Sequence, residues 1–85
     1  MESRFHEIRS VPLWLVREYL EELDGRASDE THVTGDGWQA TLEKMEPVPL
    51  GSLRIGRVSL VLEGEAQVIE SLWAKLEMKL LRAGG

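Results

Sequence analysis

The fold is decided by the stretch Thr31-His-Val-Thr-Gly-Asp-Gly-Trp-Gln-Ala-Thr-Leu-Glu-Lys-Met45. Its centre, Gly35-Asp36-Gly37, supplies the positive φ angles that a tight connection between two strands needs. After this turn every second residue is apolar (Trp38, Ala40 and Leu42), which is typical of a strand with one buried face. The stretch therefore predicts a β-hairpin whose apolar face needs a cover.

Two amphipathic helices that flank the predicted strands can supply this cover. The first is expected to begin after a cap at Ser10 or Val11, with Pro12 in its first turn and Gly25 as a left-handed C-cap. Its apolar stripe comprises Leu13, Val16, Leu20 and Leu23, widened by Leu15 and Tyr19. The second helix is expected from about residue 65 to residue 82, with an apolar arc made of Ala66, Ile69, Leu72, Trp73, Leu76 and Leu80.

Strands are also expected before the first helix and after the hairpin. Residues 4–10 have a short strand pattern, and residues 53–63 have a longer one. Apolar positions change parity within the longer pattern, so we expect a bulge or a break at Gly56-Arg57. Residues 46–51 contain two prolines, which lack the N–H groups of a strand ladder, and are therefore predicted to form a connecting loop.

The resulting order, β-α-β-β-β(β)-α, predicts a single α+β domain over residues 1–85. Each helix has one apolar stripe and the strands have one apolar parity, so both helices are expected on one face of an antiparallel sheet. A ferredoxin-like fold is the nearest competitor, but no strand pattern follows Arg82.

The composition excludes several function classes. The formal net charge is −5 and is concentrated in residues 12–25 and 26–37, so nucleic acid is an unsuitable partner. The absence of cysteine excludes disulfides and thiolate chemistry. No apolar run approaches the roughly 18 residues of a membrane span, and the first residues lack the apolar core of a signal peptide. We therefore expect a cytoplasmic protein without membrane contact.

The scarcity of amide side chains bears on the source of the protein. Asparagine is absent, and glutamine occurs only at Gln39 and Gln67. Fewer thermolabile side chains are typical of thermophilic proteins, whereas codon bias in a GC-rich genome explains the same pattern. Both interpretations stay open.

Two glycine motifs are similar to nucleotide-binding loops without meeting their requirements. Gly35-Asp-Gly-Trp-Gln-Ala40 is followed by a strand pattern, whereas a dinucleotide loop opens a helix. Gly51-Ser-Leu-Arg-Ile-Gly56 is followed by Arg57 where a phosphate-binding loop needs lysine. No cofactor is therefore expected.

The two histidines, His6 and His32, do not have the spacing of metal ligands. No serine lies in a nucleophile elbow either. We therefore expect no metal site and no catalytic residue, and each histidine is interpreted as a strand residue. A composite site of both histidines and an acid stays open, because the sequence does not show spatial proximity.

Several side chains outside the apolar stripes are candidate partner contacts. Trp14 falls on the charged arc of the first helix and is expected either to pack locally, for instance by stacking on Arg17, or to anchor a partner. The open face of the sheet, on which Arg54 is expected, is a second candidate surface. The partner-binding candidates are Trp14, Arg17, Glu18, Glu21 and Arg54, and the candidates for a homodimer patch are Met78 and Leu81.

Three ordered segments carry a family resemblance: Val11-Pro-Leu-Trp-Leu-Val-Arg-Glu-Tyr-Leu-Glu-Glu-Leu-Asp-Gly25, Gly51-Ser-Leu-Arg-Ile55 and Val58-Ser-Leu-Val-Leu-Glu-Gly-Glu65. The chain resembles the C-terminal domain of proteins related to the small subunit of molybdopterin synthase. This resemblance implies a TATA-binding-protein-like α+β fold and a domain without an established function. In those proteins a ubiquitin-like sulfur-carrier domain comes first, and that half is expected to be absent here.

The last two residues, Gly84 and Gly85, support an alternative. A C-terminal diglycine is the group that is modified in sulfur carriers, but a frayed helix end explains the same residues. We therefore expect a non-catalytic accessory or protein-interaction domain associated with molybdenum cofactor biosynthesis. Its expected partner is a sulfur carrier or a molybdopterin synthase component. The alternatives are a sulfur carrier modified at Gly85 and a small-ligand-binding domain.

Overall fold

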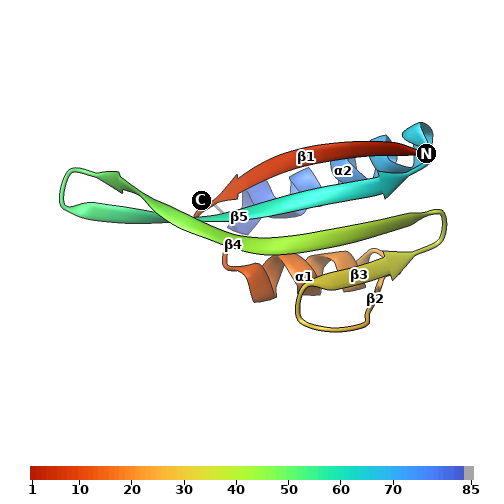
Figure 1. Cartoon of the computed structure of the whole chain (residues 1–85), viewed down its shortest axis with the longest axis horizontal. Helices are drawn as coiled ribbons and strands as arrows, with labels where there is room; N and C mark the ends of the chain where they lie inside the picture. Colours follow the sequence, from red (N-terminus) through yellow and green to blue (C-terminus); the bar gives the residue numbers. More distant parts are fainter. Residues whose placement is uncertain (84–85) are drawn as a thin grey trace.

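The computed structural model describes residues 1–83 and shows an open sheet covered by two helices (Figure 1). The strands are β1 (Glu2–Arg9), β2 (Arg26–Ala27), β3 (His32–Gly35), β4 (Trp38–Leu50) and β5 (Leu53–Gly64), and the helices are α1 (Leu13–Glu22) and α2 (Ala66–Ala83). The sheet order is β1-β5-β4-β3-β2, and all neighbouring strands are antiparallel. The predicted α+β class and the order of elements are confirmed.

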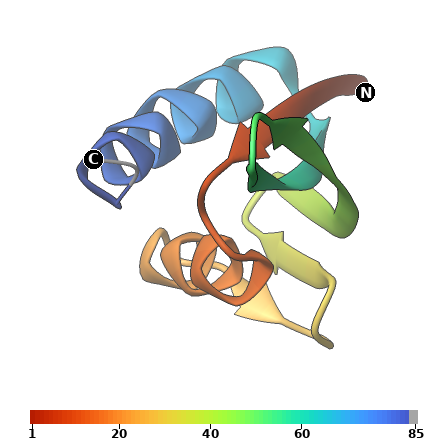
Figure 2. The same ribbon diagram turned by 90° about the vertical axis from the view of Figure 1, so that its left-hand side faces the viewer.

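The core lies between one face of the sheet and the two helices. Figure 2 shows α1 and α2 on the same side of the strands, as predicted. Directly paired residues of β4 and β5 share a face, and the pairs Ala40 with Leu62 and Leu42 with Leu60 point toward the helices. The side chains with at most 1% exposure are Val16, Leu20, Val33, Ala40, Leu42, Leu60, Leu62, Ile69 and Leu76. One apolar cluster therefore joins both helices to the sheet.

The N-terminal end of α1 differs from the prediction. Pro12 is the N-cap rather than a first-turn residue, and its carbonyl accepts hydrogen bonds from the N–H groups of Leu15 at 3.0 Å and Val16 at 3.2 Å. Ser10 is not a cap, because its φ of 65° turns the chain from β1 toward the helix. Val11 is buried and anchors this junction in the core.

The C-terminal end of α1 also differs from the prediction. The left-handed residue is Asp24, with a φ of 69°, and not Gly25. The N–H group of Gly25 donates to the carbonyl of Leu20 at 3.0 Å. A Cβ atom on Gly25 would lie 2.6 Å from that carbonyl oxygen and 2.6 Å from Val33 Cγ1. Glycine is therefore required here for close approach rather than for its φ angle.

A two-stranded arm extends from the body of the sheet, at the left of Figure 1. β4 continues through Pro47 and Pro49 and pairs with β5 past a bulge between Met45 and Val48. The predicted loop over residues 46–51 is therefore wrong. The prolines are tolerated because β3 pairs only with the first part of β4, which leaves the outer edge of β4 free in the arm.

The strand β5 runs through this arm without the predicted break at Gly56-Arg57, and the irregularity lies in β4 instead. The apolar parity changes because the arm extends beyond the helices, so that Leu53, at 65% exposure, has no core to join. Arg54 alternates with Leu53 in the unbroken strand and shares its parity with Val58. Its expected position on the open face of the sheet is therefore wrong.

The ring of His6 packs against helix α2. It stacks on the indole of Trp73, with the ring centroids 3.6 Å apart and the planes 4° from parallel. Burial lowers the pKa of His6, while Glu77 raises it and Arg4 lowers it to smaller extents. The interpretation of His6 as a strand residue is confirmed.

We predict that Gly25→Ala lowers the free energy of unfolding by about 2 kcal/mol, because the new methyl group overlaps backbone and core atoms that cannot move independently. Urea unfolding followed by circular dichroism measures this change. The matched control is Gly56→Ala, since a Cβ atom on Gly56 meets no atom within 4 Å. Equal stability of the two variants would show that the close approach at Gly25 does not constrain the fold.

We predict that the pKa of His6 lies below 6.5 in an NMR titration and that Trp73→Leu raises it toward that value. Because folding lowers this pKa, the unfolded chain binds the proton first as the pH falls. The associated stability is present above about pH 6.5 and is lost as the pH falls through the lowered pKa of His6 in the folded state. His6→Gln should remove this part of the pH dependence; an unchanged dependence would assign it to other groups.

Candidate functional site

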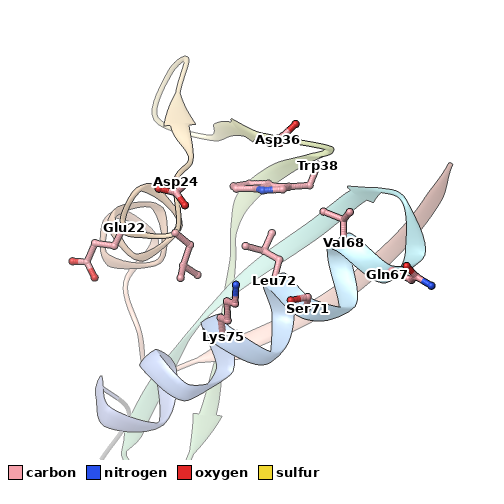
Figure 3. Close-up of a pocket in the computed structure, with 10 residues that line it drawn as sticks. Glu22, Asp24, Asp36, Trp38, Gln67, Val68, Ser71, Leu72 and Lys75 are labelled. Atoms are coloured by element: carbon pink, nitrogen blue, oxygen red, sulfur yellow. The ribbon is translucent and has the colours of Figure 1, made fainter.

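A cleft of about 430 Å³ lies between the C-terminal end of α1 and the side of α2 (Figure 3). We call it the tryptophan cleft. The α1 side and the hairpin contribute Glu22, Leu23, Asp24, Asp36 and Trp38. The helix α2 contributes Gln67, Val68, Ser71, Leu72 and Lys75. The cleft therefore combines an apolar floor with charged side chains at its rim.

The indole of Trp38 is held in place by two glycines. A Cβ atom on Gly35 would overlap the indole, and one on Gly25 would lie 2.8 Å from the indole Cη2 atom. The ring therefore lies directly over backbone and is only 7% exposed. Figure 3 shows the ring above Leu72, with Val68 on the same helix beside it. This packing forms the floor without any ligand.

The rim of the tryptophan cleft carries charges of both signs. Glu22 accepts a hydrogen bond from Lys79 Nζ at 2.7 Å, which ties α1 to α2. In the described part of the chain, Lys75 forms no ion pair within 4.0 Å with Asp24 or Asp36. These groups can therefore bind charged parts of a ligand.

The chemistry of the tryptophan cleft is that of binding. Ser71 is exposed, and among residues 1–83 no hydrogen bond joins it to a histidine, lysine or carboxylate that could act as its base. The described residues contain no group of three or more histidine, aspartate and glutamate side chains placed to hold a metal ion. An apolar floor with a few convergent polar groups is typical of a site that binds a small molecule.

A second groove, of about 630 Å³, lies at the N-terminal end of α1. Trp14 and Arg17 of α1 line it together with Lys44 and Arg57 of the sheet. The Arg17 guanidinium is positioned by the loop before β3, because its Nη1 donates to the carbonyl of Glu30 at 3.1 Å. Trp14 and Arg17 thus connect this groove to the outward face of α1.

The structure brings four of the five predicted partner contacts together. They line one shallow hollow on the outward face of α1, and we call this set the α1 face: Trp14, Arg17, Glu18 and Glu21. The Trp14 side chain is 56% exposed and lies outside the apolar core cluster. Within the described residues, the cation–π contact is between Lys79 and Tyr19, and the expected stacking of Trp14 on Arg17 is not formed.

The remaining predicted site residues lie elsewhere. Arg54 is exposed in the arm, where it pairs with Pro49, and does not line the α1 face. Met78 and Leu81 on α2 are 63% and 72% exposed, as a homodimer patch requires, and their role stays a prediction. The candidate carrier residues Gly84 and Gly85 lie outside the described part of the chain.

The two histidines do not form a composite site. His6 faces α2, whereas His32 lies on β3, which is separated from β1 by two strands. His32 Nδ1 lies 2.9 Å from Asp29 Oδ1, and the backbone N–H of Thr31 donates to the same oxygen at 2.8 Å. These contacts, that of His32 first, lower the pKa of Asp29 to about 2. They order the loop before β3 and leave His32 exposed.

Sequence reasoning missed the tryptophan cleft. One usable signal was the spacing of Gln67, Ser71 and Lys75, which places three polar side chains in a row on one side of α2. The contributions of Asp24 and Asp36 had no such signal, because they depend on how the end of α1 and the hairpin turn meet. No helix among the described residues has the length and apolar character that a membrane span requires.

Comparison with known proteins places this chain in a family. The family described as "Archaeal MoaD-like protein" matches residues 4–85, which is all but the first three residues. No curated protein matches the chain. The family match links the chain to proteins related to the small subunit of molybdopterin synthase, in agreement with the resemblance seen in the sequence. The chain therefore belongs to the archaeal MoaD-like protein family.

Proposed function

We propose that this chain is a non-catalytic protein-interaction domain that serves molybdenum cofactor biosynthesis by binding a sulfur carrier or a component of molybdopterin synthase. The observation that carries the proposal is Trp14, which is 56% exposed on the α1 face of a protein that belongs to the archaeal MoaD-like family. The family supports the biological context, and Trp14 supports the mode of action.

An exposed tryptophan on the outward face of an amphipathic helix is suited to anchor a partner. Folding does not need the Trp14 ring in the core, since the apolar stripe of α1 is already supplied by Val16, Leu20 and their neighbours. Tryptophan is enriched among the residues that contribute most to binding at protein interfaces, and surrounding polar groups keep water out of such contacts. On the α1 face this surround consists of Arg17, Glu18 and Glu21.

The charge of the α1 face indicates the chemistry of the partner. Glu18 and Glu21 are exposed on this face, and Arg17 is the cation beside them. A partner surface with a basic rim around an apolar recess complements this arrangement. Attraction of this kind accelerates association and weakens as salt is added.

A second candidate function is that of a sulfur carrier modified at Gly85. The observation that favours it is that the MoaD-like family match includes residues 84 and 85. In this alternative the terminal glycines are the reactive part, and the α1 face plays no role. The two candidates therefore differ in which residues a test must change.

We predict that Trp14→Ala weakens capture of a molybdopterin synthase component or of a ubiquitin-like sulfur carrier by at least about tenfold, since an interface tryptophan often contributes 2 kcal/mol or more. Capture by the immobilised domain, quantified by surface plasmon resonance, measures the loss. Leu53→Ala in the arm is the matched control, because Leu53 is similarly exposed, at 65%. Equal binding by the two variants, or no binding above that of an unrelated acidic domain, contradicts the proposal.

We also predict that the intact mass of the protein stays unchanged when it is incubated with an adenylating enzyme, ATP and a sulfur donor. A non-catalytic interaction domain has no reason to be modified at its C-terminus. A mass gain that corresponds to sulfur in place of oxygen, and that disappears when Gly85 is deleted, would establish the carrier function instead. A known sulfur carrier in the same reaction is the positive control.

A further inference from the structure

We propose that the tryptophan cleft binds a small zwitterion with an apolar side chain, as in a free α-amino acid, with Lys75 binding the carboxylate and Asp24 binding the ammonium group. The cleft and the α1 face involve different residues, so this inference goes beyond the proposed function. It rests on the size of the cleft, on the unpaired charges of Lys75 and Asp24 within the described residues, and on the position of the C-terminal end of α1.

The size and floor of the cleft suit such a ligand. Its volume of about 430 Å³ lies within the range of roughly 300 to 1,000 Å³ that is typical of small-molecule sites. Trp38, Val68 and Leu72 provide an apolar surface for a side chain of the ligand. Because Gly25 and Gly35 fix the indole, this surface needs no rearrangement on binding.

The charges across the floor of the cleft are opposite in sign and lack partners in the described residues. Figure 3 shows Lys75 reaching into the cleft from α2, while Asp24 lies on the α1 side. No ion pair within 4.0 Å joins them, among the residues that the structure describes. Lys79 already holds Glu22 at 2.7 Å, so Lys75 is the amine of this rim that can bind a carboxylate.

The end of α1 favours the ammonium group on the Asp24 side. The last carbonyl groups of a helix lack intrahelical partners and carry partial negative charge, which attracts cations. Asp24 follows the C-cap residue Leu23 of α1, and Asp36 of the hairpin turn adds a second carboxylate to the cleft. The ammonium group therefore meets negative charge on one side, while the carboxylate meets Lys75 on the other.

The same charges argue against phosphorylated or otherwise strongly anionic ligands. The carboxylates of Glu22, Asp24 and Asp36 line the cleft, and Lys75 is the one cationic side chain among its lining residues. A dianion would face uncompensated repulsion at this rim. The cleft is open to solvent, so we expect a dissociation constant of about 1 to 10 mM.

The test uses L-phenylalanine as the probe and the ¹⁵N-labelled protein in an NMR titration. We expect saturable shifts of amides in the cleft, at residues 22–25, 36–38 and 67–75. Two derivatives each remove one charge: N-acetyl-L-phenylalanine lacks the ammonium group and L-phenylalanine amide lacks the carboxylate. Each should bind about tenfold more weakly, because a hydrogen bond to a charged group is lost.

The variants Lys75→Gln and Asp24→Asn link each derivative to one side chain. Lys75→Gln should weaken binding of L-phenylalanine about tenfold and leave binding of the amide unchanged. Asp24→Asn should weaken binding of L-phenylalanine and leave binding of the N-acetyl derivative unchanged. Asparagine tolerates the positive φ of this position, so the backbone is expected to keep its conformation. The control variants are Lys44→Gln, which matches Lys75→Gln, and Glu43→Gln, which matches Asp24→Asn. Both residues lie outside the cleft, so these variants should bind L-phenylalanine like the wild type.

Three outcomes would overturn the inference. They are the absence of localised shifts at about 50 mM L-phenylalanine, equal binding of all three probes, and equal effects of the cleft and control variants. Unchanged amide spectra outside the cleft verify that each variant is folded. Partner capture through Trp14 is measured separately, so failure of the cleft site and failure of the proposed function can be distinguished.

Discussion

The packing of the Trp38 indole against the backbone of Gly25 and Gly35 is the constraint on which the rest of the structure depends. It fixes the end of α1 over the start of β4, and the side chain of Leu72 on α2 completes the contact. A side chain on either glycine would separate these elements by the width of a methyl group or more. The same contact closes one end of the core and forms the floor of the tryptophan cleft.

The parts of the fold that were predicted correctly are those in which local pattern and burial agree. The apolar arc of α2 and the alternation after Trp38 each face the core, so periodicity alone identified them. The arm was missed because Pro47 and Pro49 normally indicate a loop, and only the strand order shows that their edge of β4 is free. Gly25 does lie at the C-terminal end of α1, as predicted, but Asp24 takes the left-handed conformation in its place. Glycine is needed at position 25 because a Cβ atom there would overlap its neighbours.

The same distinction between local pattern and long-range packing applies to the two functional surfaces. The position of Trp14 outside the apolar stripe of α1 can be read from a helical wheel of the sequence alone. The structure confirms that its side chain lies outside the core. The tryptophan cleft joins the end of α1, a hairpin turn and one side of α2, whose residues are separated by up to about 50 positions in the chain. Such a site depends on long-range packing, so no local pattern contains it.

Helix α1 also explains how one small domain can carry two independent surfaces. The α1 face lies along the outward side of α1, whereas Asp24 follows the C-cap of the helix and lines the cleft, so a partner and a ligand contact different residues. The ion pair between Glu22 and Lys79 fixes α1 against α2 at the rim of the cleft. A ligand that bridges Asp24 and Lys75 would add a second link between the same helices. Binding at the cleft would then stabilise the helix that presents Trp14 without changing the residues of the α1 face.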